Sequence, residues 1–381
     1  MMSSKLEKYN MVLVMLFFCH GFLYFYSGDI YNPDNPVKLL KYFLIIAIFI
    51  FSFKFIELKP DNIFILSTFL LYLIFTALYY ILNNTQIFSV ITFLIPVLFF
   101  LLPGAFKYEN LLRLMRFIIY LATLFSVLEI LFFDEISERF NSTGFRSISI
   151  FVNPNNFAVV ICLALSLLTG SKNSIYTKSR LWVWICSSVS VILSGSMTGV
   201  VIILFLFALN IIDLVSLKVK ATKYYRFIAL SIIGLVSIIT MVYLVDMDKY
   251  LRSADSVGMD NVTARFDYLT RFITNVADNI FYPLIAHPDL YADNAFVYTW
   301  INLGFFGFVL YISFSLLLIY LSIFNNSKKA FTQFMLCIFL ASVTTNILNI
   351  WPVAYLYWLV AGFICNKKSN ERSSDKVQLE S

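Results

Sequence analysis

Charged residues are scarce in this 381-residue chain: they make up 13% of it, against about a quarter in soluble proteins. Hydrophobic residues make up 60% and aromatic residues 18%, and the mean hydropathy is +0.82. Such a composition excludes an ordinary soluble domain. It predicts a membrane protein that crosses the bilayer many times.

Motifs for nucleotide, metal and disulfide chemistry are missing as well. No glycine-rich stretch resembles a P-loop, no Gly-x-Ser-x-Gly elbow occurs, and no expected cytoplasmic loop could hold a nucleotide-binding domain. Asp246 and Asp248 resemble a metal-binding pair, but on a helix their carboxylates would point about 200° apart. We therefore expect no cofactor, no metal ion and no ATP-driven chemistry.

The five cysteines never share a CxxC spacing, and all fall in or at the edge of apolar runs. They are Cys19, Cys162, Cys186, Cys337 and Cys365. This pattern favours neither a disulfide framework nor a zinc site.

A membrane span needs roughly 20 mostly apolar residues, and the apolar runs predict about twelve transmembrane helices. The predicted ranges are 10–26, 38–56, 62–82, 87–106, 111–133, 155–170, 181–195, 197–216, 226–245, 293–324, 329–349 and 351–365. No Ala-x-Ala cleavage site follows the first run, so we expect it to stay in the mature protein. His20, which lies in this first run, is expected to contact neighbouring helices. The predicted fold class is an all-α polytopic membrane protein.

Basic residues predict the orientation. If the N-terminus is cytoplasmic and the spans alternate, 20 of the 28 lysines and arginines fall on the cytoplasmic side and eight on the other. The positive-inside rule favours this arrangement, which places both termini in the cytoplasm. Because the basic residues mark cytoplasmic edges, we expect no binding of nucleic acid.

Six of the eight outward basic residues lie in two loops, 134–154 and 246–292, which we expect to face the periplasm and to carry the function. Residues 1–365 are predicted to form one transmembrane domain that includes both loops. Residues 366–381 are expected to form a disordered cytoplasmic tail, because they are polar and charged.

The larger loop, 246–292, is predicted to contain a short amphipathic helix over about 260–276. Its apolar stripe consists of Phe266, Leu269, Ile273 and Val276. Arg265 projects at the edge of this stripe and is the better candidate for a site, although it could instead snorkel beside lipid headgroups. Arg271 lies on the far side, where a solvated pair with Asp267 is the alternative.

His287 precedes the long predicted helix 293–324. An imidazole with an ordinary pKa of about 6.5 suits proton abstraction at neutral pH, and a bystander role is the alternative. Asp293 would open the helix, where aspartate is also simply a good cap. Gly304 and Gly307 are expected to let this helix pack closely against a neighbour.

The smaller loop, 134–154, holds Arg139 and Arg146 on the side that basic residues avoid. Guanidinium groups suit phosphate and pyrophosphate, which they bind with two parallel hydrogen bonds. Asn153 and Pro154 at the end of the loop predict a helix start, with Asn153 as the cap and Pro154 in the first turn.

Three places in the middle of the chain, roughly 145–310, carry a family resemblance. They are Phe145-Arg146 followed by Phe151-Val152-Asn153-Pro154-Asn155-Asn156-Phe157-Ala158; Leu193-Ser194-Gly195-Ser196-Met197-Thr198-Gly199; and Arg265 leading to Asp293-Asn294-Ala295-Phe296 and the Gly304/Gly307 helix. In this order they resemble the O-antigen polymerase (Wzy) family, which is related to the O-antigen ligases. Met197 departs from the pattern, because many relatives have arginine or lysine there.

The resemblance implies a metal-independent glycosyltransferase in a bacterial inner membrane. It would join oligosaccharide repeat units, carried on undecaprenyl pyrophosphate, at the periplasmic face. Its partners would be the lipid-linked donor and acceptor, the lipid bilayer and a chain-length regulator. On this basis catalysis is assigned to His287, Arg265 and Asp293. Substrate binding is assigned to Arg146, Arg271, Arg139, Arg252, Asn153, Asn155 and Asn294.

Other functions stay open. A flippase or other transporter would favour charged residues at mid-membrane, but Glu129 and Asp213 lie near the ends of their predicted helices. An O-antigen ligase would use a lipid A-core acceptor instead. A glycosyltransferase with paired acids could use Asp29 and Asp34, although a turn explains these residues more simply.

Overall fold

The computed structural model describes the chain in twelve stretches. They are residues 2–23, 35–56, 59–83, 88–132, 146–151, 153–171, 174–219, 270, 274–276, 294–324, 329–348 and 351–366. Every regular element assigned in these stretches is a helix, as the predicted fold class requires.

The α-helices are α1 (Met2–Cys19), α3 (Pro36–Ser52), α4 (Pro60–Leu82), α5 (Phe88–Val97), α6 (Tyr108–Leu131), α8 (Pro154–Thr169), α9 (Ser174–Ser194), α10 (Met197–Val219), α13 (Ala295–Phe324), α14 (Lys329–Thr344) and α15 (Val353–Cys365). Short 3₁₀ helices are η1 (His20–Leu23), η2 (Phe53–Phe55), η3 (Leu98–Gly104) and η4 (Ser149–Phe151).

Eleven of the twelve predicted spans coincide with one of these helices, and the remaining one, 226–245, lies outside the described residues. Within the described stretches, four helices are long and apolar enough to cross a membrane: Pro36–Phe55, Pro60–Leu82, Tyr108–Leu131 and Ala295–Ile323. Where their side chains are described as well, seven further apolar helices span 10–17 residues, such as Arg180–Ser194 in α9 and Met197–Ile212 in α10. A 16-residue helix such as α8 is about 24 Å long, less than the roughly 30 Å of a bilayer core. The chain is therefore a helical membrane protein, and the number of its crossings stays a prediction.

Asparagine followed by proline begins two of the helices. The Asn35 side chain accepts a hydrogen bond from the N–H of Val37 at 3.0 Å, just before α3. Asn153 caps α8, and Pro154 is its first residue, so both of these sequence predictions are confirmed. Proline suits this position because the first N–H groups of a helix have no partner within the helix.

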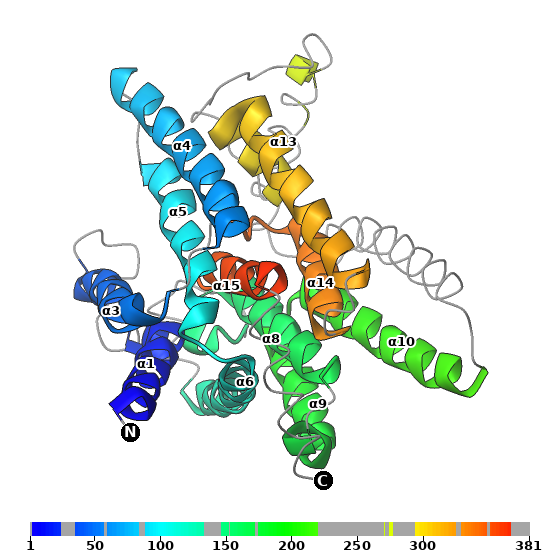
Figure 1. Cartoon of the computed structure of the whole chain (residues 1–381). Helices are drawn as coiled ribbons and strands as arrows, with labels where there is room; N and C mark the ends of the chain where they lie inside the picture. The colour runs from blue at the N-terminus through cyan, green and yellow to red at the C-terminus, as the bar shows by residue number, and fades with distance from the viewer. Residues whose placement is uncertain are drawn as a thin grey trace.

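Two helices, α8 and α15, are buried in the interior of the bundle. Every residue from 157 to 169 on α8 and from 353 to 364 on α15 is buried. Figure 1 shows α15 in the centre, between α5 and α14. Its Trp358 ring lies 4.9 Å from that of Phe69 and 5.3 Å from that of Phe314, measured between centroids. Helices that are apolar all round are stable only in such a core or in a membrane.

The peripheral helices expose apolar side chains instead. Leu39 and Phe43 on α3, and Phe64 and Leu71 on α4, are each at least 65% exposed. Clusters of this kind are rare on soluble monomers. They are expected where the outer faces of a bundle meet lipid chains.

The predicted helix 293–324 is not continuous, so the expectation of one long helix is wrong. Gly304 in α13 has φ 74° and ψ 176°, far from helical values, and it divides the element into two helical halves. Glycine allows this because it has no Cβ to clash at positive φ. The conformation of Gly304, and not only its small size, explains its place in the helix.

Hydroxyl groups from α4 bind the backbone at this break. Tyr80 donates to the carbonyl oxygen of Asn302 at 3.1 Å, and Tyr72 donates to that of Leu303. In a membrane such carbonyls need partners, because hydrocarbon supplies none. A Cβ on Gly307 would lie 2.8 Å from the Tyr72 ring and 2.4 Å from the Leu303 Cβ, which confirms close packing at Gly307.

The predicted amphipathic helix in loop 246–292 is described only at residues 270 and 274–276. The Thr274 hydroxyl donates to the carbonyl of Thr270 at 2.9 Å, a spacing found in helices. Val276, from the predicted apolar stripe, packs in a small cluster around Ile301 of α13. The rest of that helix and the tail after Asn366 lie outside the described residues.

Candidate functional site

The candidate site is built around residues 146–151, which we call the Arg146 segment. Three neighbouring elements hold it. On α6, the Glu129 carboxylate accepts hydrogen bonds from the Ser147 hydroxyl and, at 3.1 Å, from the Ile148 N–H. The Ser149 hydroxyl donates to the carbonyl of Ala122, also on α6, at 2.8 Å.

The end of α9 and the 3₁₀ helix η1 complete this cradle. The N–H of Ser147 donates to the carbonyl of Leu193 at 2.9 Å. The carbonyl of Ile150 lies so close to Gly21 that a Cβ there would be 1.9 Å from its oxygen. The backbone of the segment is thus fixed from several sides, which gives the Arg146 side chain a defined starting point.

Arg146 reaches from this segment to both α8 and α9. Its Nη2 donates to Oδ1 of Asn155 at 3.0 Å, and its Nε donates to the carbonyl of Ser194 at 3.2 Å. Gly195 has φ 59°, and a Cβ on it would lie 3.4 Å from Nε of Arg146. Glycine at this position therefore serves the left-handed turn, and the Arg146 side chain passes over it at van der Waals distance.

Two helices begin beside this guanidinium. The Asn153 side chain accepts from the N–H groups of Asn155 at 2.9 Å and Asn156 at 3.2 Å at the start of α8. The Ser196 hydroxyl accepts from the N–H of Gly199 at 3.4 Å at the start of α10. Helix N-termini carry partial positive charge, and an arginine adds a full one. This combination of charges suits an anionic group such as a phosphate.

Asn294 belongs to a separate hydrogen-bonded group. Its Oδ1 accepts from the N–H of Phe296 at 2.9 Å and of Val297 at 3.2 Å, so it caps α13 in the place expected for Asp293. Its Nδ2 donates to the carbonyl of Val343 at 2.6 Å. Asn294 therefore ties the start of α13 to the end of α14, and its role in substrate binding stays a prediction.

Six of the predicted site residues lie outside the described residues. They are His287, Arg265, Asp293, Arg271, Arg139 and Arg252. All three predicted catalytic residues are among them, so their roles stay predictions.

Glu129, Ser147 and Gly195 were not among the predicted site residues. Glu129 carried a signal, because an acidic residue in an apolar helix is costly and is usually kept for a reason. Its place near the end of the predicted helix makes this signal weaker than that of an acidic residue at mid-membrane. Nothing in the sequence indicated that Ser147 would face this carboxylate, since the two are joined by a loop of unknown path.

His20 is a helix-contact residue, as predicted. It is 3% exposed, its Nδ1 donates to the carbonyl of Phe17 at 2.6 Å, and its ring lies 4.5 Å from that of Trp351. The five cysteines are all free, as their spacing predicted. In the described stretches no three His, Cys, Asp or Glu side chains converge.

The chain was compared with known proteins: no family model matches it, and no curated protein matches it.

Proposed function

We propose that this chain is a polysaccharide polymerase of the membrane, similar to the O-antigen polymerases. It joins oligosaccharide repeat units carried on undecaprenyl pyrophosphate. The observation that carries the proposal is the position of Arg146. Its guanidinium bonds to Asn155 in one resemblance motif and to Ser194 in another, although Asn155 and Ser194 lie 39 residues apart in sequence.

The chemistry needs a cation at such a place. A hydroxyl oxygen of the acceptor sugar attacks the anomeric carbon of the donor, the bond from that carbon to the pyrophosphate oxygen breaks, and undecaprenyl pyrophosphate leaves with its electron pair. Fixed positive charge stabilises the charge that develops on the leaving group. We assign this to Arg146 and Arg265, with Arg139, Arg252 and Arg271 as further substrate contacts. A base, His287 or Asp293, takes the hydroxyl proton.

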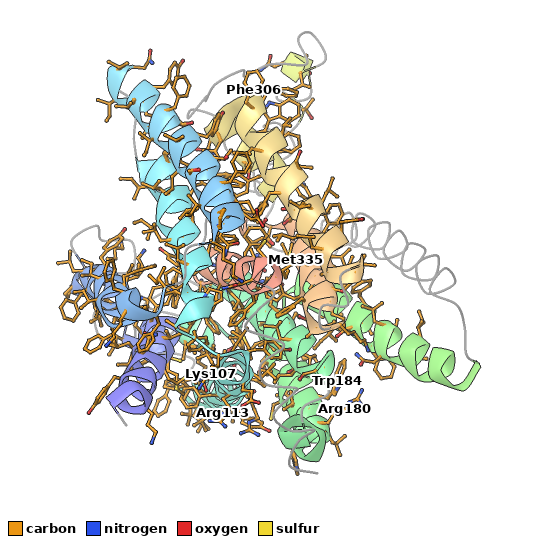
Figure 2. All side chains as sticks on the ribbon, in the orientation of Figure 1. Lys107, Arg113, Arg180, Trp184, Phe306 and Met335 are labelled. Atoms are coloured by element: carbon orange, nitrogen blue, oxygen red, sulfur yellow. The ribbon has the colours of Figure 1, made fainter. Side chains whose placement is uncertain are left out.

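The proposed topology has about twelve spans, cytoplasmic termini and a periplasmic site in a bacterial inner membrane. The distribution of basic side chains supports it. Figure 2 labels three of these side chains, Lys107 and Arg113 at the start of α6 and Arg180 on α9. All three basic residues belong to the predicted cytoplasmic side, where lysine and arginine are enriched.

The test is deletion of the gene in its host, followed by electrophoresis of the surface polysaccharide with and without a plasmid copy. Polymerase activity predicts that the ladder collapses to core plus a single repeat unit and that the plasmid restores it. An unchanged ladder contradicts the proposal. A chain-length regulator, the expected partner, should alter the distribution of lengths only while this chain is present.

A transporter of lipid-linked oligosaccharide is the second candidate, and the break of α13 at Gly304 favours it. Discontinuous helices line the binding sites of many transporters. The same deletion separates the two functions. Transport predicts loss of all species that carry repeat units, with lipid-linked units accumulating inside the cell. An O-antigen ligase predicts polymer that stays on undecaprenyl pyrophosphate and never reaches lipid A-core.

A further inference from the structure

Glu129 is an acidic side chain buried in an apolar helix. It lies in the last turn of α6 and is 4% exposed. A carboxylate is expensive to bury unless donors surround it. Its donors here, the Ser147 hydroxyl and the Ile148 N–H, both come from the Arg146 segment and both bond to Oε2. No donor among the described residues reaches Oε1.

The segment needs such an anchor. Ser149 has φ 48°, a left-handed conformation that is uncommon for residues with a Cβ. Conformations of this kind persist where the surroundings hold them in place. Glu129 accepts hydrogen bonds from the two residues before Ser149, and the carbonyl of Ala122 accepts one from the Ser149 hydroxyl at 2.8 Å. Helix α6 therefore binds the turn at two points, which are about two helical turns apart.

We infer that Glu129 is a positioning residue for Arg146. Arg146 directly precedes Ser147, so the place of the Ser147 backbone sets where the arginine side chain starts. Without the carboxylate, the Ser147 hydroxyl and the Ile148 N–H lose their acceptor, and the turn at Ser149 is free to shift. The guanidinium then no longer meets Asn155 and the Ser194 carbonyl together. The effect of Glu129 on catalysis rests on the proposed function, whereas its hold on the segment does not.

The first test measures polymer formation in membrane vesicles from lipid-linked repeat units. Glu129→Gln keeps the size of the side chain and one oxygen, and Glu129→Leu removes every acceptor. We expect Glu129→Leu to slow polymerisation by about tenfold, and Glu129→Gln less, because a buried hydrogen bond to a charged group is among the stronger ones. Glu109→Gln is the matched control, because Glu109 is an exposed carboxylate in the first turn of the same helix. It should leave the rate unchanged.

The second test is a double-substitution cycle, which separates positioning from a general loss of folded protein. If Glu129 acts through Arg146, then Glu129→Leu has little further effect in an Arg146→Lys background, where the guanidinium fork is already gone. If the two substitutions instead reduce the polymerisation rate independently, so that the double variant shows the product of both losses, the inference is wrong. Membrane levels of each variant are measured by immunoblot, and rates are expressed per amount of protein.

The third test does not depend on activity. Ile150, fully buried in the segment, is replaced by cysteine in a chain whose five native cysteines are alanine. Cys reactivity with a maleimide should be absent in this background and with Glu109→Gln, and should appear with Glu129→Leu. If the cysteine at position 150 stays unreactive with the maleimide in the Glu129→Leu variant, the inference is wrong, whatever the polymerisation rate. Normal polymer from Arg146→Ala would instead refute the proposed site, and the labelling would still decide whether Glu129 holds the segment.

Discussion

Arg146 donates a hydrogen bond of 3.0 Å to the side chain of Asn155, in the first turn of α8. The bond joins a residue that precedes a helix to the start of that helix, across a tight cap formed by Asn153. It holds the guanidinium beside two helix N-termini, where an anion would be stabilised by both charge and N–H groups.

Replacement of Arg146 by alanine should reduce polymer formation by about a hundredfold, the order of loss found when one group that stabilises developing charge is removed. The measurement is the length distribution and amount of surface polysaccharide in a deletion strain that carries the variant. Arg180→Ala is the matched control. Arg180 also donates from Nη2 to an asparagine, Asn210, at 3.3 Å, but on α9 and α10 away from the site. Equal losses in the two variants would argue against a specific role for Arg146.

Asn153→Ala should lower the free energy of unfolding by about 1 kcal/mol, because it leaves the first N–H groups of α8 without their acceptor. Asn153→Asp should keep most of the stability, since its carboxylate accepts the same hydrogen bonds. The measurement is thermal unfolding of the purified protein in detergent. A variant Asn153→Ala as stable as the natural chain would show that the cap contributes nothing in this context.

Gly195→Ala should be destabilising because of the backbone. The left-handed conformation of Gly195 costs a residue with a Cβ about 1–2 kcal/mol, whereas a methyl group there would meet Nε of Arg146 at 3.4 Å, an ordinary contact. The destabilisation should therefore be the same in an Arg146→Ala background, as measured by thermal unfolding. A smaller loss in that background would show that the added methyl group does crowd the Arg146 side chain.

The positions of the helices could be predicted from the sequence because each apolar run is long and ends in polar residues. Asn153 and Pro154 even fixed the first residue of α8, since capping is a local property of the chain. The break at Gly304 could not be predicted in this way. A glycine in an apolar run fits a continuous helix as well as a broken one, and only the tyrosines of α4, more than 200 residues earlier, provide partners for the carbonyls at the break.

The candidate site was predictable only in part. Arg146, Asn153 and Asn155 share one motif in the sequence, and their contact is local. The meeting of Arg146 with Ser194, and of Glu129 with Ser147, depends on how α6, α8 and α9 pack. Such packing follows from the shapes of many side chains together, which no single motif records.

Removal of the hydroxyl groups at the α13 break should destabilise the membrane domain. Tyr80→Phe leaves the carbonyl of Asn302 without its 3.1 Å donor, and Tyr72→Phe does the same to Leu303. Each change should cost about 1–3 kcal/mol, the usual penalty for a buried acceptor that loses its partner. Tyr79→Phe is the matched control and should have little effect, because Tyr79 is on the same helix and half-buried like Tyr72, but its hydroxyl bonds to none of the described residues.

The same break predicts that Gly304 cannot be replaced without a change of backbone. Gly304→Ala should destabilise the protein by more than either tyrosine substitution, because alanine rarely adopts φ 74° and would favour a continuous helix that separates Tyr72 and Tyr80 from their carbonyls. Thermal unfolding compares the variants. The contrary result is a Gly304→Ala variant that is as stable as the natural chain and in which Tyr72→Phe has no further effect. It would show that α13 tolerates a straight form and that the fold does not require the break.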